Sequence, residues 1–169
     1  VLVDPQYRDS FEDAQYEMDL AADKINEMLT GIDKVQTALH LCRRNWGRRG
    51  WGAEGGYEPI IETMKKIDVD QYVMEFSIPV TGDVAILRQL PDDKLIGLGA
   101  VECRFDKIDT RDEIVARVEE AMKHVDPERL SINPDCGFFQ LPRWLSYLKL
   151  EAMVAGTSIV RRELGIEES

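Results

Sequence analysis

Four side chains of the types that bind zinc stand at the end of short apolar runs in this sequence, or within a few residues after them. They are His40, Cys42, Glu75 and Cys136. The carboxyl ends of parallel strands meet at one edge of a sheet, so strands formed by these runs would bring the four side chains together. Imidazole, thiolate and carboxylate are a typical zinc ligand set. The pattern therefore predicts a zinc site with two thiolates, which favours chemistry on a sulfur atom.

A zinc site of this composition would activate a thiol rather than water. A free thiol has a pKa near ~8.5 and is mostly protonated at neutral pH, whereas zinc binding deprotonates it. Two thiolates and a carboxylate carry more negative charge than Zn²⁺ neutralises, so the metal is a poor Lewis acid for water. A bound sulfur keeps much of its nucleophilicity, and we expect it to attack an alkyl carbon.

Each of these residues also has a simpler structural interpretation. His40 alone would be a buried, hydrogen-bonded core histidine, and Glu75 would form a salt bridge at the end of a strand. The same ligands could build a closed structural zinc site, although the ligands of such sites come in close-spaced pairs. Cys103 is most simply a small buried hydrophobic residue, with a ligand or reactive role as the alternative.

The ligand-bearing runs alternate with segments of helical periodicity. The expected strands are 35–39, 72–76, 95–101 and 130–132. The expected helices are 11–29 with Ser10 as N-cap, 57–67, 84–90, the segment that begins with the capping box 110–113, and 144–164. Such alternation indicates an α/β fold with a parallel sheet. A full (β/α)8 TIM barrel needs about 250 residues, so the single domain predicted over 1–169 is about half of one.

The segment after the His-Cys pair is rich in arginine, glycine and tryptophan. Guanidinium groups bind carboxylates, sulfonates and phosphates through paired hydrogen bonds, so this loop is expected to capture the anionic tail of a substrate. A solvated loop is the alternative, and the tryptophans would either stack on a flat donor or pack the loop against the protein. The candidate substrate-binding residues are Arg43, Arg44, Asn45, Trp46 and Asn133.

Charge and composition narrow the classes of partner. The chain of 169 residues has 21 Lys and Arg against 32 Asp and Glu, a net charge of −11. An acidic chain repels phosphate backbones, so no nucleic acid partner is expected. There is no run of about 18 apolar residues to cross a membrane and no signal-peptide pattern. The three cysteines do not suggest a disulfide framework, which favours a cytoplasmic location. The start at Val1 suggests a cut within a longer protein.

Three segments together resemble the C-terminal catalytic barrel of cobalamin-independent methionine synthase, and especially the short, single-barrel members of that superfamily. They read HLCRRNWGRRGWGAEGGYEPI at 40–60, YVMEF at 72–76 and LSINPDCGF at 130–138. The resemblance covers nearly the whole chain and implies that the four residues named first bind zinc. It also implies the C-terminal half of a barrel in an enzyme of methionine biosynthesis, which moves a methyl group from a folate nitrogen to the sulfur of homocysteine.

The chain departs from this family after the apolar run 95–101. The family carries an Asp-Ile-His-Ser-Pro-type motif there, whose histidine is thought to supply a general acid, whereas this chain reads Val101-Glu102-Cys103-Arg104-Phe105. Glu102 is therefore a candidate to exchange a proton in place of the histidine. Asp135 precedes Cys136 and would orient a ligand or cap the following turn. Glu102 and Asp135 are the candidate catalytic residues.

The leading interpretation is zinc-dependent transfer of a methyl or alkyl group to the thiol of a small molecule. The arginine-rich loop and the missing histidine favour an alternative, known from the related enzyme epoxyalkane:coenzyme M transferase, in which a thiol such as coenzyme M adds to an epoxide. A third interpretation is a non-catalytic zinc-binding half-barrel, as a fragment or a subunit. Because a half-barrel exposes two sheet edges, we expect a homo-oligomer, or pairing with the missing half.

Overall fold

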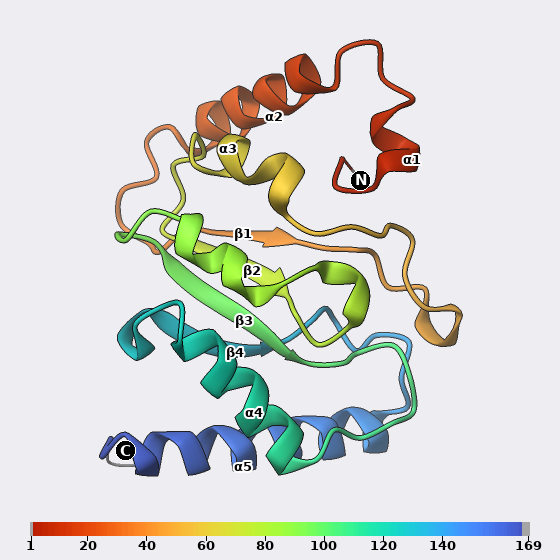
Figure 1. Ribbon diagram of the computed structural model, residues 1–169, viewed down its shortest axis with the longest axis vertical. Coiled ribbons are helices and arrows are strands. Elements are labelled where there is room, and N and C mark those ends of the chain that lie inside the picture. Colours follow the sequence, from red (N-terminus) through yellow and green to blue (C-terminus); the bar gives the residue numbers. More distant parts are fainter. Residues whose placement is uncertain (1, 167–169) are drawn as a thin grey trace.

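The computed structural model describes residues 2–166, which form an α/β fold around one parallel sheet (Figure 1). The strand order follows the sequence, β1-β2-β3-β4, and every neighbouring pair is parallel, as expected. The strands are β1 (Ala38–Leu41), β2 (Gln71–Glu75), β3 (Leu95–Val101) and β4 (Leu130–Pro134). The helices are α1 (Pro5–Arg8), α2 (Ala14–Leu29), α3 (Ile61–Met64), α4 (Arg111–Met122) and α5 (Arg143–Glu163).

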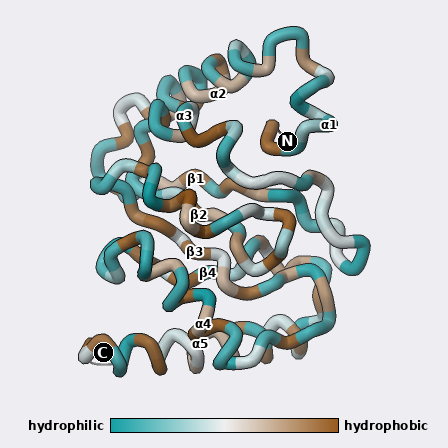
Figure 2. Tube along the Cα trace, in the orientation of Figure 1, coloured by the Kyte–Doolittle hydropathy of each residue, from teal (hydrophilic) through white to brown (hydrophobic). Residues whose placement is uncertain are grey.

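The helices lie on both flanks of the sheet. Figure 1 shows α2 and α3 beyond β1, and α4 and α5 beyond β4, with the strands between them. Figure 2 shows hydrophobic residues along the strands and hydrophilic ones in the surrounding loops. No helix within residues 2–166 combines the length and the apolar character needed to cross a membrane.

The core is built on the two inner strands. Tyr72 and Met74 of β2, and Ile96 and Leu98 of β3, have at most 1% of their surface exposed. Burial of a side chain of this size stabilises the fold by about 1.5–3 kcal/mol. Ile114 of α4 is buried with them. The inner strands are therefore firmly held, which fixes the positions of their carboxyl ends.

The first helices differ from the expectation. The carboxylate of Asp13 caps α2 by accepting a hydrogen bond from the Tyr16 amide at 2.9 Å. Ser10, the expected N-cap, instead donates to the carbonyl of Tyr7 at 2.5 Å and closes α1, a short helix that was not expected. The expected start of the helix was therefore wrong, because the Ser10 hydroxyl is already engaged by the preceding turn.

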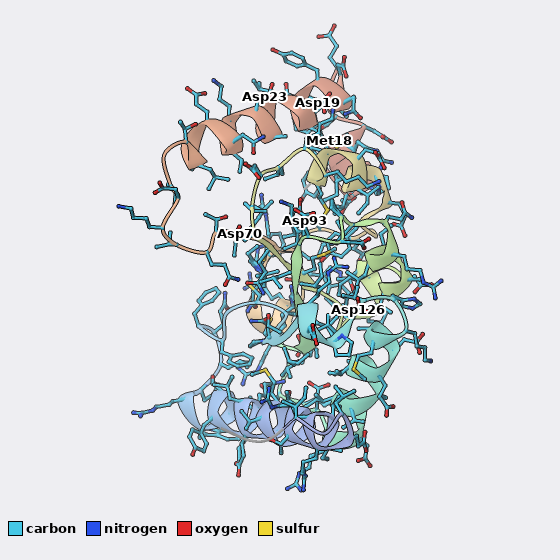
Figure 3. The ribbon with its side chains drawn as sticks, turned by 90° about the vertical axis from the view of Figure 1, so that its left-hand side faces the viewer. Met18, Asp19, Asp23, Asp70, Asp93 and Asp126 are labelled. Atoms are coloured by element: carbon cyan, nitrogen blue, oxygen red, sulfur yellow. The ribbon has the colours of Figure 1, made fainter. Side chains whose placement is uncertain are left out.

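The strand β1 begins later than the expected run. The carboxylate of Asp70, labelled in Figure 3, accepts hydrogen bonds from the amide and the hydroxyl of Thr37 at 2.6 and 2.9 Å. This contact lies immediately before Ala38, where β1 starts. His40 therefore lies inside the strand rather than after it, and Cys42 follows directly at the strand end.

Two expected helices are largely 3-10 turns. Segment 57–67 contains the 3-10 helix Glu58–Ile60 followed by the single-turn α3, and segment 84–90 contains the 3-10 helix Val84–Gln89. The capping box at the start of α4 is present, and α5 ends within one residue of the expected position. The helices α4 and α5 were thus predicted more closely than the two short segments.

Candidate metal centre

The structure brings all four expected ligand residues to the carboxyl-terminal edge of the sheet. His40 lies in β1 and Cys42 just after it, Glu75 ends β2, and Cys136 follows β4. One ligand atom of each residue lies within 4.8 Å of the other three. Cys42 Sγ and Cys136 Sγ are 3.4 Å apart although 94 positions separate them in the sequence. This group of nitrogen, sulfur and oxygen donors could hold a metal ion.

The imidazole of His40 is oriented by the neighbouring strand. Its Nδ1 lies 3.2 Å from the carbonyl oxygen of Val73, the residue opposite it in the β1–β2 register. A carbonyl oxygen only accepts hydrogen bonds, so Nδ1 carries the proton and Nε2 is the nitrogen left for a metal. Hydrogen bonding to Cys136 raises the pKa of His40.

Cys136 is the thiol of the cluster that ionises most readily. Hydrogen bonds with Cys103, Cys42 and His40 stabilise its thiolate and lower its pKa. The same hydrogen bonds, together with burial, raise the pKa of Cys42 and of Cys103. The Arg44 amide also donates to Cys42 Sγ at 3.1 Å. Cys103 is buried, as expected, and its Sγ accepts hydrogen bonds from Asn45 Nδ2 at 3.7 Å and Arg104 Nη1 at 3.5 Å.

Asp135 connects the end of β4 to the end of β2. Its buried carboxylate accepts hydrogen bonds from the amides of Phe76 and Ser77, both at 3.1 Å, and from the Ser77 hydroxyl at 2.5 Å. Burial raises the pKa of Asp135 to about 7. These contacts hold the residue before Cys136 against the residues after Glu75. An orienting role for Asp135 stays a prediction.

Glu75 is fully buried and paired with an arginine to which the sequence analysis assigned no role. Arg104 Nη2 lies 2.8 and 2.9 Å from the two carboxylate oxygens of Glu75. Desolvation raises the pKa of Glu75, and Arg104 opposes this shift. The sequence gives only a weak signal for this contact, namely a charged residue just after an apolar strand. The partner of Arg104 lies 29 positions away, so local spacing does not reveal it.

Glu102 folds the loop that follows β3. One carboxylate oxygen accepts a hydrogen bond from the Arg104 amide at 2.5 Å and the other from the Phe105 amide at 2.7 Å. Lys149, a buried residue of α5, donates to the backbone carbonyl of Glu102 at 2.9 Å. Both carboxylate oxygens therefore have structural partners, and proton exchange by Glu102 stays a prediction.

Two expected substrate-binding residues instead hold the loop after β1. Arg43 is buried, its Nε and Nη2 donate to the carbonyl of Gly55 at 3.1 and 2.8 Å, and its guanidinium lies 4.2 Å from the ring centre of Tyr57. Asn45 is also buried and donates to the carbonyl of Gly137 at 2.7 Å. Because these groups are already paired inside the protein, capture of a substrate anion by Arg43 does not fit the structure.

The other three candidates remain accessible. Arg44 is exposed, in a left-handed conformation with φ of 64°, and Trp46 is 47% exposed. Asn133 is partly buried in β4, where its Oδ1 accepts a hydrogen bond from the Ser131 hydroxyl at 3.2 Å. A pocket of about 710 Å³ lies beside the loop, and Trp46 is part of its lining.

Comparison with protein families gives a match over residues 6–158 to the family described as cobalamin-independent synthase, catalytic domain. The chain is 34% identical to a methionine synthase of Pyrococcus horikoshii and 36% identical to one of Pyrococcus abyssi, each over 148 residues. Each match covers 88% of this chain and 40% of the relative. The chain thus spans about two fifths of the length of these relatives.

A solved structure with the same arrangement of elements is the B12-independent methionine synthase from Shewanella sp. W3-18-1 in complex with selenomethionine. The two structures superpose with a TM-score of 0.72 at 26% sequence identity. The match covers 90% of this chain and 48% of the Shewanella chain. The likeness in fold therefore extends over nearly all of the elements described above.

Proposed function

Because the chain belongs to the family of cobalamin-independent synthase catalytic domains, we propose that it takes part in zinc-dependent transfer of a methyl group to the sulfur of a small-molecule thiol. Its relatives named methionine synthase make homocysteine the proposed thiol, with a small-molecule alkyl donor as the second substrate. The observation that carries the proposal is the convergence of the ligand atoms of His40, Cys42, Glu75 and Cys136 to within 4.8 Å.

The donor set fits zinc in type and spacing. Two thiolates on a tetrahedral zinc, with Zn–S bonds of about 2.3 Å, lie about 3.8 Å apart. Cys42 and Cys136, at 3.4 Å, would need to separate only slightly. His40 is exposed and both thiols are partly exposed, so a substrate could approach the site. When bound, zinc would deprotonate a substrate thiol and preserve its nucleophilicity.

The protein's own residues would orient the ligands and contact the substrate. The Val73 carbonyl fixes the ring of His40, and Asp135 holds the segment after Glu75. The accessible residues Arg44, Trp46 and Asn133 are proposed to contact the substrates, and Glu102 stays a candidate for proton exchange.

We also propose that the four parallel strands form about half of a (β/α)8 barrel. The structural likeness to the Shewanella enzyme supports this, because it covers 90% of this chain but 48% of that one. In a barrel each strand pairs on both sides, so the outer edges of β1 and β4 would pair with a second copy or with the other half of the barrel.

The epoxide alternative loses part of its support in the structure. This alternative relied on an arginine-rich loop that would capture the anionic tail of a thiol substrate. Arg43 of that loop is buried against Tyr57. Methyl transfer to a thiol is therefore the better-supported function.

Elemental analysis of the purified chain tests the metal site. We expect about one zinc per chain, as in a mononuclear site, and loss of this zinc in the double variant Cys42→Ser/Cys136→Ser. Cys103→Ala is the matched control, because it removes a neighbouring thiol that is not a proposed ligand, and it should retain zinc. Zinc that remains bound to the double variant would contradict the assignment.

A zinc-edge X-ray absorption spectrum with and without homocysteine tests the thiol substrate. An additional sulfur neighbour near ~2.3 Å in the presence of homocysteine is the expected result. An unchanged sulfur shell would point to a structural or incomplete site and would contradict the proposal that this chain alone binds the thiol.

A further inference from the structure

A buried arginine contacts the segments that carry the proposed metal ligands. It follows β3, the strand that supplies no ligand. This residue, Arg104, has no exposed surface. Besides its two contacts with Glu75, Nη2 donates to the carbonyl of Arg44 at 2.8 Å and Nε donates to the same carbonyl at 3.1 Å. Its Nη1 lies 3.8 Å from Asp135 Oδ2. One guanidinium group thus reaches the ends of β1, β2 and β4.

Each of these contacts bears on a ligand. Glu75 is itself one of the four residues of the cluster. The Arg44 amide donates to Cys42 Sγ at 3.1 Å, so fixing the Arg44 backbone also helps to fix Cys42. Asp135 directly precedes Cys136. Arg104 therefore contacts one proposed ligand directly and the neighbours of two others.

Burial of either Arg104 or Glu75 without the other would destabilise the folded protein. Neither side chain has any exposed surface, and their closest nitrogen-oxygen distance is 2.8 Å. A buried carboxylate without a partner loses much of its hydration free energy, whereas a guanidinium supplies both opposite charge and a planar set of donors. The arginine thus offsets the cost of a carboxylate at a fully buried position.

We propose that Arg104 is a positioning residue of the metal centre, which holds the Glu75 carboxylate in place as a ligand and offsets the excess negative charge of the ligand set. The inference rests on the proposed zinc site. Two thiolates and one carboxylate carry one more negative charge than Zn²⁺ carries positive charge, and the guanidinium supplies the missing positive charge. Residues that orient metal ligands in this way commonly contribute to metal affinity.

Zinc affinity, measured by competition with a chromogenic chelator, tests this role. Arg104→Gln should bind zinc about 10- to 100-fold more weakly than the wild-type chain. Arg104→Lys keeps the charge but loses the planar donor set, and should fall between the two. Arg48→Gln is the matched control, because Arg48 is an exposed arginine that pairs with Asp106 at 2.8 Å outside the cluster, and its zinc affinity should stay unchanged.

A double-mutant cycle separates positioning from a general effect on folding. If Arg104 acts through Glu75, then Arg104→Gln should change zinc affinity much less in a Glu75→Gln background than in the wild-type background. The variant Glu75→Gln/Arg104→Gln removes both buried charges, so it stays interpretable even if Arg104→Gln alone does not fold. Circular dichroism monitors folding of every variant.

The outcomes distinguish this inference from the proposed function. Wild-type zinc affinity in Arg104→Gln, or an equal loss with and without Glu75, would overturn the role of Arg104 and leave the zinc site standing. Failure of the wild-type chain to bind zinc would overturn both proposals.

Discussion

Gly99 lies where β2, β3 and the side chain of Asp135 meet. A Cβ atom at this position would lie 2.5 Å from Asp135 Oδ1, 2.6 Å from the carbonyl oxygen of Met74 and 2.9 Å from the Cα of Glu75. Two of these three atoms belong to the backbone of β2, so the neighbours cannot simply turn aside. The absence of a side chain at Gly99 is therefore what allows Asp135 to reach the end of β2.

Gly99→Ala should lower the free energy of unfolding by about 2–3 kcal/mol, because the added methyl group overlaps fixed atoms. Urea denaturation measures the change. Gly137→Ala is the control, since the nearest atom to its added Cβ is 4.0 Å away, and it should change stability by less than about 0.5 kcal/mol. Equal stability of the two variants would show that β2 and β3 are less closely packed at Gly99 than the structure has them.

Individual residues differ in how far the sequence predicts their roles. The candidate ligands His40, Cys42 and Cys136 could be found because their types are distinctive and apolar runs precede them. The role of Arg104 could not, because its partner is set by the register of β2 and β3 rather than by local spacing. Arg43 was interpreted as a substrate contact, since nothing nearby in the sequence shows that the carbonyl of Gly55 would engage its guanidinium.

At the scale of elements, α4 begins with a capping box whose glutamate also forms an ion pair. The Thr110 hydroxyl accepts a hydrogen bond from the Glu113 amide at 3.2 Å, and the Glu113 carboxylate accepts one from the Thr110 amide at 2.8 Å. Lys107 also pairs with Glu113 at 2.5 Å. The hydrogen bond with Lys107, followed by those with Thr110, lowers the pKa of Glu113 to about 2.

This lowered pKa predicts a pH dependence of stability. A carboxyl group whose pKa is lower in the folded state stabilises the fold above its unfolded pKa of 4.5, and this contribution is lost as the pH falls toward about 2. Glu113→Gln should therefore be less stable than the wild-type chain at pH 6, by less than about 1 kcal/mol because the group is partly exposed to solvent. The difference should shrink as the pH falls from 4.5 to 3.

Urea denaturation at several pH values measures this difference. Glu119→Gln removes the same charge from an exposed position of α4 and serves as the control. A Glu113→Gln difference that is constant between pH 6 and pH 3 would contradict the electrostatic origin of the effect.

Elements with strong local signals were predictable, and those fixed by distant contacts were not. The capping box and the apolar stripe define α4 from local sequence, and β3 was expected with its observed bounds. The start of β1 depends on the hydrogen bonds between Thr37 and Asp70, which are 33 positions apart. No local pattern reports such a contact, so the expected strand began too early.

At the scale of the whole molecule, the described residues leave the two outer strands with one neighbour each. β1 pairs with β2 and β4 pairs with β3, so each has one edge without a strand partner. Large apolar side chains lie exposed in α5 and in the loop before it, among them Phe139 at 75%, Tyr147 at 69% and Trp144 at 64%. Unpaired edges and exposed apolar surface favour association with another chain.

We therefore expect the chain to associate in solution, with a mass by light scattering above the 19.3 kDa of one chain. Each chain carries a net charge of −11, so added salt should screen the repulsion between copies and raise the associated fraction. A constant mass of 19.3 kDa across protein and salt concentrations would contradict the half-barrel proposal.

The place of Arg104 after β3 has a consequence for how such a site can diversify. The four residues of the cluster come from β1, β2 and β4 and the loops that follow them, whereas β3, which lies between β2 and β4, contributes a cation instead. A substitution at this one position would change the charge beside the proposed metal site and would free the Glu75 carboxylate from its partner, although every donor residue would keep its identity. The fold thereby couples the charge of the site to the position of one of its donors, so we expect related sequences that differ in the residue after the third strand to differ in metal affinity and in reactivity together.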